Sequence, residues 1–203
     1  MENGWIYEKE ALDAGYTVVC GTDEAGRGPL AGAVYAAAVV LPYGCEIAKL
    51  DDSKKLTEKR RDELYDIIKE TAVSFCVATA SAKEIDEINI LNAAMLAMRR
   101  AIDGLSVKPD IALVDGNKAI GFTIPARPIV KGDSLSMSIA AASILAKVER
   151  DRYMQTLHEM YPQYQFDKHK GYPTKLHYEM IDKYGVCDEH RRSFLKKRYG
   201  DNI

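Results

Sequence analysis

The sequence predicts an α/β protein built on one mixed β-sheet that is flanked by helices. Two strand-like apolar segments come first, at residues 17–22 and 33–41, with no helical pattern between them. Later strand-like segments alternate with segments whose apolar residues recur at helical spacing, and the chain ends in a helical segment. Strands followed by alternating strands and helices are typical of a mixed sheet covered by helices.

The strand predictions depend on residue type. Residues 17–22 begin with the β-branched Thr17 and Val18, which favour a strand. Residues 33–41 are almost all Ala and Val, as in a strand that is covered on both faces. Three further strands are expected at 73–79, 111–114 and around 129–130.

The helix predictions depend on apolar spacing and on end signals. Thr57 can cap the N-terminus of one helix, Gly104 can end a second and Pro162 can stop a third. The helices expected on these grounds span 57–68, 82–105, 136–160 and about 175–184.

Length and composition indicate an ordinary soluble globular protein. The 203 residues are 47% hydrophobic and 29% charged, which fits one large domain or one domain with a helical appendage. The N-terminal residues lack the pattern of a secretory signal. The longest uncharged run, Gly28 to Cys45, is interrupted by Pro and Gly residues, so we interpret it as a strand with its turns and not as a membrane span.

Cysteine spacing and charge distribution give further indications of the class of protein. The four cysteines are far apart and form no CxxC pair, which favours reduced thiols in the cytoplasm over zinc ligation or a disulfide framework. Residues 1–135 contain 16 basic and 21 acidic side chains, whereas residues 136–203 contain 12 and 9. This asymmetry suits an acidic metal site beside a basic face, with the basic excess greatest at Arg191-Arg192 and at 196–198.

Four carboxylates follow three of the predicted strands. Asp23 and Glu24 follow the first strand, Asp115 follows the strand at 111–114, and Asp133 follows the strand near residue 129. In an open α/β sheet, groups at the ends of separate strands can converge on one ligand. Carboxylates drawn together repel one another unless cations lie between them. Two Mg²⁺ or Mn²⁺ ions roughly 3.5–4 Å apart would form the clamp used in phosphodiester hydrolysis.

Each acid also has a simpler interpretation. Asp133 could cap the long helix that follows it, and Asp115 with Gly116 could be an ordinary turn. The pair Asp23-Glu24 is harder to explain as a solvated turn, because an arginine bracketed by two glycines follows it directly. Taken together, the four acids favour the metal site.

The same glycines admit a second interpretation as a dinucleotide-binding loop. Gly26, Gly28 and Ala31 match the pattern G-x-G-x-x-A after a strand. That pattern must open a helix, whose N-terminus binds the pyrophosphate. Residues 33–40 instead have the composition of a strand, and no Walker-type Gly-Lys-Ser/Thr is present. The sequence therefore disfavours both nucleotide-binding loops.

A series of short motifs runs through nearly the whole chain. In order they are DEAGRGPLAG at 23–32, DSKKL at 52–56, VDG at 114–116, KGDS at 131–134, SIAAASILAK at 138–147, KGYPT at 170–174 and HRRSF at 190–194. In their number and order these motifs resemble ribonuclease HII, the type 2 ribonuclease H of bacteria. The resemblance implies a ribonuclease H-like mixed sheet, with a catalytic domain over residues 1–162 and a C-terminal helical segment over 163–203 that is packed on it and contacts substrate.

The resemblance also implies an activity and a set of site residues. The activity is metal-dependent endonucleolytic cleavage of RNA in RNA–DNA hybrids, and of single ribonucleotides embedded in duplex DNA. Asp23, Glu24, Asp115 and Asp133 would be the catalytic, metal-binding acids, with two Mn²⁺ or Mg²⁺ ions. Gly26, Arg27 and Gly28 would sense the 2′-hydroxyl at the RNA–DNA junction, the group by which a protein distinguishes RNA from DNA.

The remaining predicted contacts lie in two loops. By the resemblance, Tyr172, in the loop 168–172, would pack on the sugar of the next deoxynucleotide, although an ordinary turn tyrosine beside Pro173 is the alternative. Ser53 and Lys54 are expected to bind phosphate, or else to be solvated. Some of Lys147, Arg150 and residues 168–170 would also track phosphates without reading base sequence.

Two other functions remain open at this point. One is a related nuclease that acts on all-DNA junctions, and the other is a non-catalytic protein that binds hybrid duplexes. The expected partners are RNA–DNA hybrid and ribonucleotide-containing DNA, bound by a monomer. A contact with replication or transcription machinery is compatible with the resemblance, but no docking motif is evident in the sequence.

Overall fold

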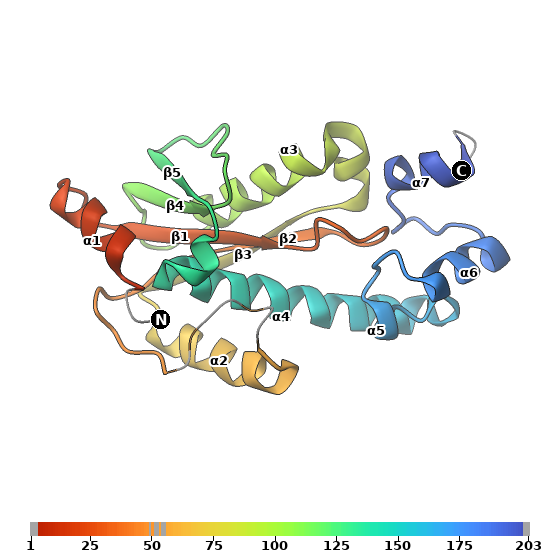
Figure 1. The fold of residues 1–203 in the computed structure, drawn as a ribbon, viewed down its shortest axis with the longest axis horizontal. Coiled ribbons are helices and arrows are strands. Elements are labelled where there is room, and N and C mark those ends of the chain that lie inside the picture. Colours follow the sequence, from red (N-terminus) through yellow and green to blue (C-terminus); the bar gives the residue numbers. More distant parts are fainter. Residues whose placement is uncertain (1–3, 49, 51–52, 54–55, 201–203) are drawn as a thin grey trace.

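A computed structural model describes residues 4–48, 50, 53 and 56–200. Its centre is a mixed five-stranded sheet with strand order β3-β2-β1-β4-β5 (Figure 1). The strands are β1 (Val19–Ala25), β2 (Val34–Val40), β3 (Ser74–Ala80), β4 (Ile111–Asp115) and β5 (Ala126–Ile129). The expected α/β fold with a mixed sheet is confirmed.

Strand direction brings the ends of two strands together. β1 pairs antiparallel with β2, and β2 with β3, whereas β1 and β4 are parallel and in register at Thr22 and Val114. β5 is parallel to β4. The carboxyl ends of β1 and β4 therefore meet at one edge, where each strand carries an acidic residue.

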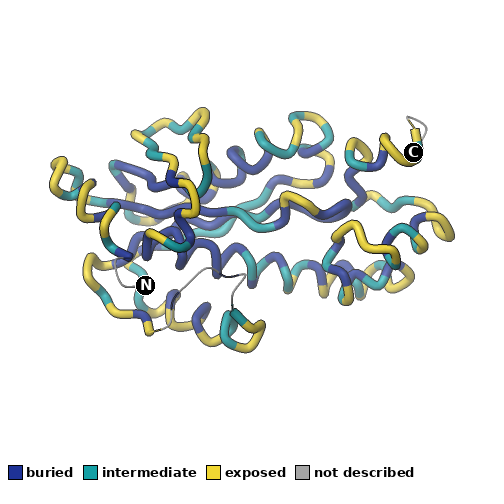
Figure 2. Tube along the Cα trace, in the orientation of Figure 1, coloured by how far each residue is buried: buried dark blue, intermediate teal, exposed yellow. Residues whose placement is uncertain are grey.

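Helices cover both faces of the sheet. The α-helices are α1 (Ile6–Asp13), α2 (Glu58–Thr71), α3 (Ala82–Asp103), α4 (Met137–Met160), α5 (Phe166–His169), α6 (Lys175–Tyr184) and α7 (Arg192–Tyr199). α3 lies on one face, and α4 with α2 outside it lies on the other (Figure 1). Most residues of β1, β2 and β4 and the inward faces of α3 and α4 are buried, whereas much of α6 and α7 is exposed (Figure 2).

The long helix α4 approaches β1 very closely. A Cβ added to Gly21 would lie 2.2 Å from the backbone carbonyl carbon of Ser138, so only glycine permits this approach. Behind the helix start, the buried carboxylate of Glu8 accepts hydrogen bonds from the Ser136 hydroxyl (2.6 Å) and from the Ser138 backbone N–H (3.0 Å). An acidic group at a helix N-terminus is favoured by the helix dipole. These contacts fix the start of α4 against the strand that carries Asp23.

The C-terminal segment folds around one end of the sheet. α5 and α6 extend beyond the end of α4, and α7 returns towards α3 (Figure 1). The carboxylate of Asp86 on α3 accepts hydrogen bonds from the backbone N–H groups of Arg192 and Ser193, both at 2.9 Å, at the start of α7. The loop between β1 and β2 reaches into the space between these helices (Figure 1).

Most predicted elements are present with shifted ends. Thr57 and Gly104 occupy the predicted cap positions of α2 and α3. The long helix expected from Ser136 begins at Met137, with Ser136 as its N-cap. The strand expected around 129–130 is wrong in its bounds, because β5 ends at Ile129. The expected loop at 168–172 is partly helical, since α5 continues to His169. The helix α1 had no counterpart in the sequence-based expectations.

Candidate functional site

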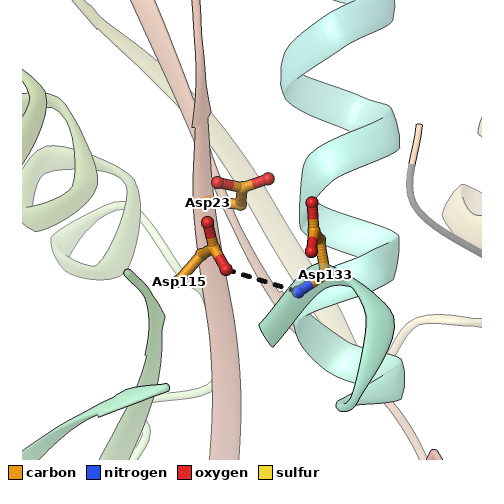
Figure 3. A group of neighbouring side chains, drawn as sticks. All are labelled: Asp23, Asp115 and Asp133. Carbon is orange, nitrogen blue, oxygen red and sulfur yellow. Dashed lines mark hydrogen bonds between the residues drawn. The ribbon is translucent and has the colours of Figure 1, made fainter. Parts of the chain in front are cut away.

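Three of the four predicted acids converge at the shared edge of β1 and β4. One carboxylate oxygen from each of Asp23, Asp115 and Asp133 lies within 4.8 Å of the other two (Figure 3). Asp23 is on β1, Asp115 is the last residue of β4, and Asp133 lies in the short 3₁₀ helix Gly132–Ser134. The Asp133 backbone N–H donates to Asp115 Oδ1 at 3.4 Å.

The turn before α4 brings Asp133 into this group. Lys131 has left-handed backbone dihedrals, and a Cβ on Gly132 would lie 2.6 Å from Ile139 Cδ1. The N-cap of α4 is Ser136, whose side chain accepts from the Ile139 N–H at 3.2 Å. The interpretation of Asp133 as that cap is therefore wrong. Asp115 does precede a tight turn, and its carboxylate belongs to the acidic group as well.

Glu24 lies beside this group and is not one of its three members. Its backbone N–H donates to Asp23 Oδ1 at 2.7 Å, and its Oε1 lies 3.5 Å from Nη1 of Arg27. Glu24 thus lines the same site from the side of the Gly-Arg-Gly loop.

A cavity of about 220 Å³ collects most of the other predicted site residues. Its lining consists of Asp23, Glu24, Ala25, Gly26, Arg27, Gly28, Ser53, Asp115, Lys147, Arg150 and Tyr172. Ser53 is buried within this lining. Lys54 lies outside the described residues. The structure therefore brings the acids, the glycine loop, Ser53 and Tyr172 to one place.

The acidic group has the chemistry of a site for hard cations. Asp23 and Asp133 are buried, and oxygen atoms are the ligands that Mg²⁺ and Mn²⁺ prefer. Carboxylates this close repel one another, and a divalent cation between them would relieve that repulsion. The donor set and its spacing fit a metal site.

The Gly-Arg-Gly loop connects two antiparallel strands and is not followed by a helix. Gly26 has a φ of +97°, and a Cβ there would lie 2.0 Å from Arg150 Nε. A Cβ on Gly28 would touch the ring of Tyr172 at 3.5 Å. The loop is thus packed between Arg150 and Tyr172 and leads into β2. This connection rules out the dinucleotide-binding interpretation, which requires a helix directly after the glycines.

Tyr172 presents a partly exposed ring on a firmly bound backbone. Its N–H donates to the His169 carbonyl at 2.8 Å, and its carbonyl accepts from Nδ1 of His177 at 3.0 Å. His177 Nε2 lies 3.1 Å from Nε2 of His190, and His190 Nδ1 accepts from the Cys187 N–H at 3.0 Å. Since backbone groups fix both ends, His190 donates to His177, and His177 donates to Tyr172.

These histidines are held in their neutral form. Burial lowers the pKa of His177 to about 4 and that of His190 to about 3. The His169 ring lowers the pKa of His177 further, and the His177 and His169 rings do the same for His190. His169 is also buried, and its ring nitrogens contact the Tyr164 carbonyl and the Gly171 N–H. His169 therefore supports the loop from inside and is not a surface contact for phosphate.

Two buried arginines lie against the Gly-Arg-Gly loop, and of these the sequence analysis named only Arg150, as a candidate phosphate contact. Arg191 was assigned to a basic face, but its side chain is fully buried, and Arg150 is only 1% exposed. Burial lowers the pKa of the Arg191 guanidinium to about 9, which leaves it charged at neutral pH. The only sequence signal was the position of Arg191 within HRRSF. Lys147, which lines the cavity, forms an ion pair with Asp151 at 2.6 Å.

No helix within the described ranges is long and apolar enough to span a membrane.

Comparisons with known proteins identify the family. The family model described as ribonuclease HII matches residues 20–199. A ribonuclease HII of Caldicellulosiruptor bescii is 53% identical over 195 residues, which cover 96% of this chain and 95% of the relative.

Solved structures of the same fold agree with that match. A ribonuclease H2 from Pyrococcus horikoshii OT3 superposes with a TM-score of 0.71 at 27% identity, over 87% of this chain and 93% of that chain. The ribonuclease HII in a complex with PCNA from Archaeoglobus fulgidus gives 0.73 at 28% identity, over 86% and 94%. The chain described here therefore belongs to the ribonuclease HII family and is a hydrolase of the ribonuclease H class.

Proposed function

We propose that this chain is a metal-dependent endoribonuclease that hydrolyses the RNA strand of RNA–DNA hybrids and cuts on the 5′ side of single ribonucleotides in duplex DNA. The products are 3′-hydroxyl and 5′-phosphate ends. The observation that carries the proposal is the convergence of Asp23, Asp115 and Asp133 within 4.8 Å in a chain of the ribonuclease HII family.

The acids have distinct proposed roles. Asp23, on the central strand β1, would contact both of two divalent ions, Mn²⁺ or Mg²⁺, and Asp115 and Asp133 would be further ligands. Glu24 completes the set from beside the Gly-Arg-Gly loop. When bound, such ions activate water and stabilise the leaving oxygen, so no protein nucleophile is needed.

Substrate recognition is assigned to the two loops that line the cavity. The backbone of residues 26–28 senses the 2′-hydroxyl, and the exposed ring of Tyr172 packs on the next sugar. Ser53 and Lys54 are proposed phosphate contacts. The proposed division of labour is that residues 1–162 carry the acids, and that the helical segment 163–203 contacts substrate through Tyr172.

The main proposed partners are nucleic acids. RNA–DNA hybrid and ribonucleotide-containing duplex are the substrates of a monomer in the cytoplasm. The PCNA complex of the Archaeoglobus fulgidus relative supports a further contact with replication machinery.

A cleavage assay tests this function. The substrate is a labelled DNA duplex with one ribonucleotide, with an all-DNA duplex as control, in the presence and absence of Mn²⁺. We expect a metal-dependent cut on the 5′ side of the ribonucleotide, and loss of that cut in Asp115→Asn. Equal cutting of plain DNA would instead favour an all-DNA nuclease, and binding without turnover in Mn²⁺ would favour a non-catalytic hybrid-binding protein.

A further inference from the structure

The guanidinium group of Arg191 binds four backbone carbonyls of the loop between β1 and β2. Nη2 donates to the Gly26 carbonyl at 2.7 Å, and Nη1 donates to those of Arg27 (3.1 Å) and Pro29 (2.8 Å). Nε donates to the Gly32 carbonyl at 2.9 Å. A planar guanidinium offers five N–H donors in a fixed fork, which suits this multiple capture.

Backbone pairing adds to the same arrangement. The Arg191 N–H donates to the Leu30 carbonyl, and the Leu30 N–H donates to the Gly171 carbonyl, both at 2.8 Å. The Gly32 N–H donates to the Glu189 carbonyl at 2.8 Å. The carbonyls of residues 26, 27, 29, 30 and 32 are thus all engaged by the C-terminal segment.

The opposite side of the loop has a different hydrogen-bonding character. Within the described chain, the backbone N–H groups of Arg27 and Gly28 donate to no other residue, and both residues line the cavity beside the acids. With its carbonyls engaged by Arg191, the loop offers donors to a bound molecule. Donors of this kind suit the oxygen of a hydroxyl or a phosphate.

A second buried arginine holds the loop from the neighbouring side. Arg150 packs against the Cα of Gly26, and its Nη2 donates to the Lys170 carbonyl at 3.0 Å. Its Nε and Nη1 are buried and have no hydrogen-bond partner among the described residues. Two positive charges therefore lie close to the loop and favour an electron-rich group on its cavity side.

We infer that Arg191 is a positioning residue for ribonucleotide recognition: it binds the loop carbonyls so that the N–H groups of Arg27 and Gly28 face the ribose 2′-oxygen. This inference rests on the proposed function and extends it to a residue with no substrate contact of its own. Arg191 sets which face of the peptide groups the substrate meets, and specificity for RNA depends on that choice.

The variant Arg191→Lys tests the inference. It keeps the positive charge, but a single ammonium with three donors cannot span four carbonyls. Dissociation constants are measured for a duplex with one ribonucleotide and for the all-DNA duplex, in Ca²⁺ and under conditions without turnover. We expect the preference for the ribonucleotide to fall at least tenfold, while binding of all-DNA duplex changes less than about twofold. Arg198→Lys, in an exposed ion pair with Asp182, is the matched control and should keep the preference.

A merely structural role would change the result in a recognisable way. The inference would be overturned if Arg191→Lys bound both duplexes more weakly by the same factor, or kept its preference for the ribonucleotide-containing duplex. It would also be overturned if the wild-type protein showed no such preference. If the variant does not fold, amide hydrogen exchange on the wild-type protein decides instead. The Arg27 and Gly28 amides should be protected more by the ribonucleotide duplex than by all-DNA duplex, and equal protection would overturn the inference.

Different experimental results would contradict the proposed function and the inference about Arg191. A wild-type protein that makes no Mn²⁺-dependent cut at a ribonucleotide would contradict the proposed function. A wild-type protein that cuts there, together with an Arg191→Lys variant that keeps its full preference, would contradict only the role of Arg191.

Discussion

Buried charges of opposite sign lie close to the residues that line the same cavity, and the two groups are arranged differently. The carboxylates of Asp23 and Asp133, 4% and 5% exposed, converge with Asp115 within 4.8 Å. The guanidinium groups of Arg150 and Arg191, 1% and 0% exposed, are directed at backbone carbonyls. The acidic group brings like charges together, whereas each arginine is paired with neutral backbone carbonyls.

The difference separates a binding site from its support. Carboxylates held close together repel one another and destabilise the folded chain until a cation binds between them. The acidic group is therefore best explained as a cation-binding site. The guanidinium N–H groups of the two arginines donate to backbone carbonyls of the chain itself, so their role is to hold a loop in place. Substitutions in the two regions should therefore affect activity and stability in different proportions.

The largest expected effect is on catalysis, in Asp23→Asn. We expect cleavage in Mn²⁺ to fall by about 10³-fold or more, which is about 4 kcal/mol, because the ligand on the central strand loses its charge. The melting temperature without metal should be unchanged or higher, because one of three crowded carboxylates is neutralised.

Single-turnover cleavage and thermal melting in chelator measure these two effects. Asp13→Asn, in an exposed ion pair with Lys9, is the control and should leave cleavage unchanged. A large loss of stability in Asp23→Asn would contradict the view that the acidic group is a binding site and not a structural one.

The next effect is on stability, in Gly26→Ala. The new Cβ would meet Arg150 Nε at 2.0 Å at a φ of +97°, and we expect a loss of about 2–3 kcal/mol in the free energy of unfolding, with reduced cleavage. Gly15→Ala is a matched control, because Gly15 has a φ of +96° and nothing within 4 Å. Denaturant unfolding of both variants isolates the cost of the collision. Equal losses would show that Arg150 moves aside freely.

A pH-dependent effect concerns the histidines behind Tyr172. Burial lowers the pKa of His177 to about 4 in the folded protein, whereas its pKa in the unfolded chain is 6.5. Between these two pH values the imidazole is protonated in the unfolded chain and neutral in the folded one. The contribution of His177 to stability is therefore complete above pH 6.5 and is lost as the pH falls towards 4. We expect this loss to be about 3 kcal/mol by pH 4.

Comparison with His177→Gln measures this contribution. Unfolding free energies at several pH values between 7 and 4 should fall less steeply in the variant than in the wild-type protein. His169 and His190 adjoin this ring and are present in both proteins, so the difference reports His177 together with its effect on the pKa of His190. Parallel pH curves would mean that His177 does not stay neutral when folded.

The sequence could predict the acidic side of the cavity much better than its basic side. Asp23, Asp115 and Asp133 follow strand-like runs, and strand ends at one edge of a sheet necessarily meet. Arg191 lies 165 residues from Gly26, and nothing in a run of basic residues distinguishes a buried guanidinium from a solvated one. Only the folded chain brings Arg191 to carbonyls that need donors.

The same limit explains what was missed in the fold. α1 has a weak apolar pattern, and its role depends on the burial of Glu8 against the start of α4. The local sequence pattern shows helical periodicity and capping residues, which is why the cap of α2 at Thr57 was predicted correctly. Contacts over long sequence distances, such as that of Glu8 with Ser136, require the tertiary structure.

The smallest expected effect is in Arg27→Ala, and it separates the loop's side chain from its backbone. The Arg27 side chain is half exposed, and its Nη1 lies 3.5 Å from Glu24 Oε1, a long contact. Exposed pairs of this kind contribute about 0–1 kcal/mol. If recognition depends on backbone N–H groups held by Arg191, Arg27→Ala should change KM by about threefold or less and leave the preference for the ribonucleotide intact. Steady-state cleavage of both duplexes measures this. A loss of preference as large as that expected for Arg191→Lys would assign recognition to the Arg27 guanidinium, and the basic side of the cavity would then bind substrate directly.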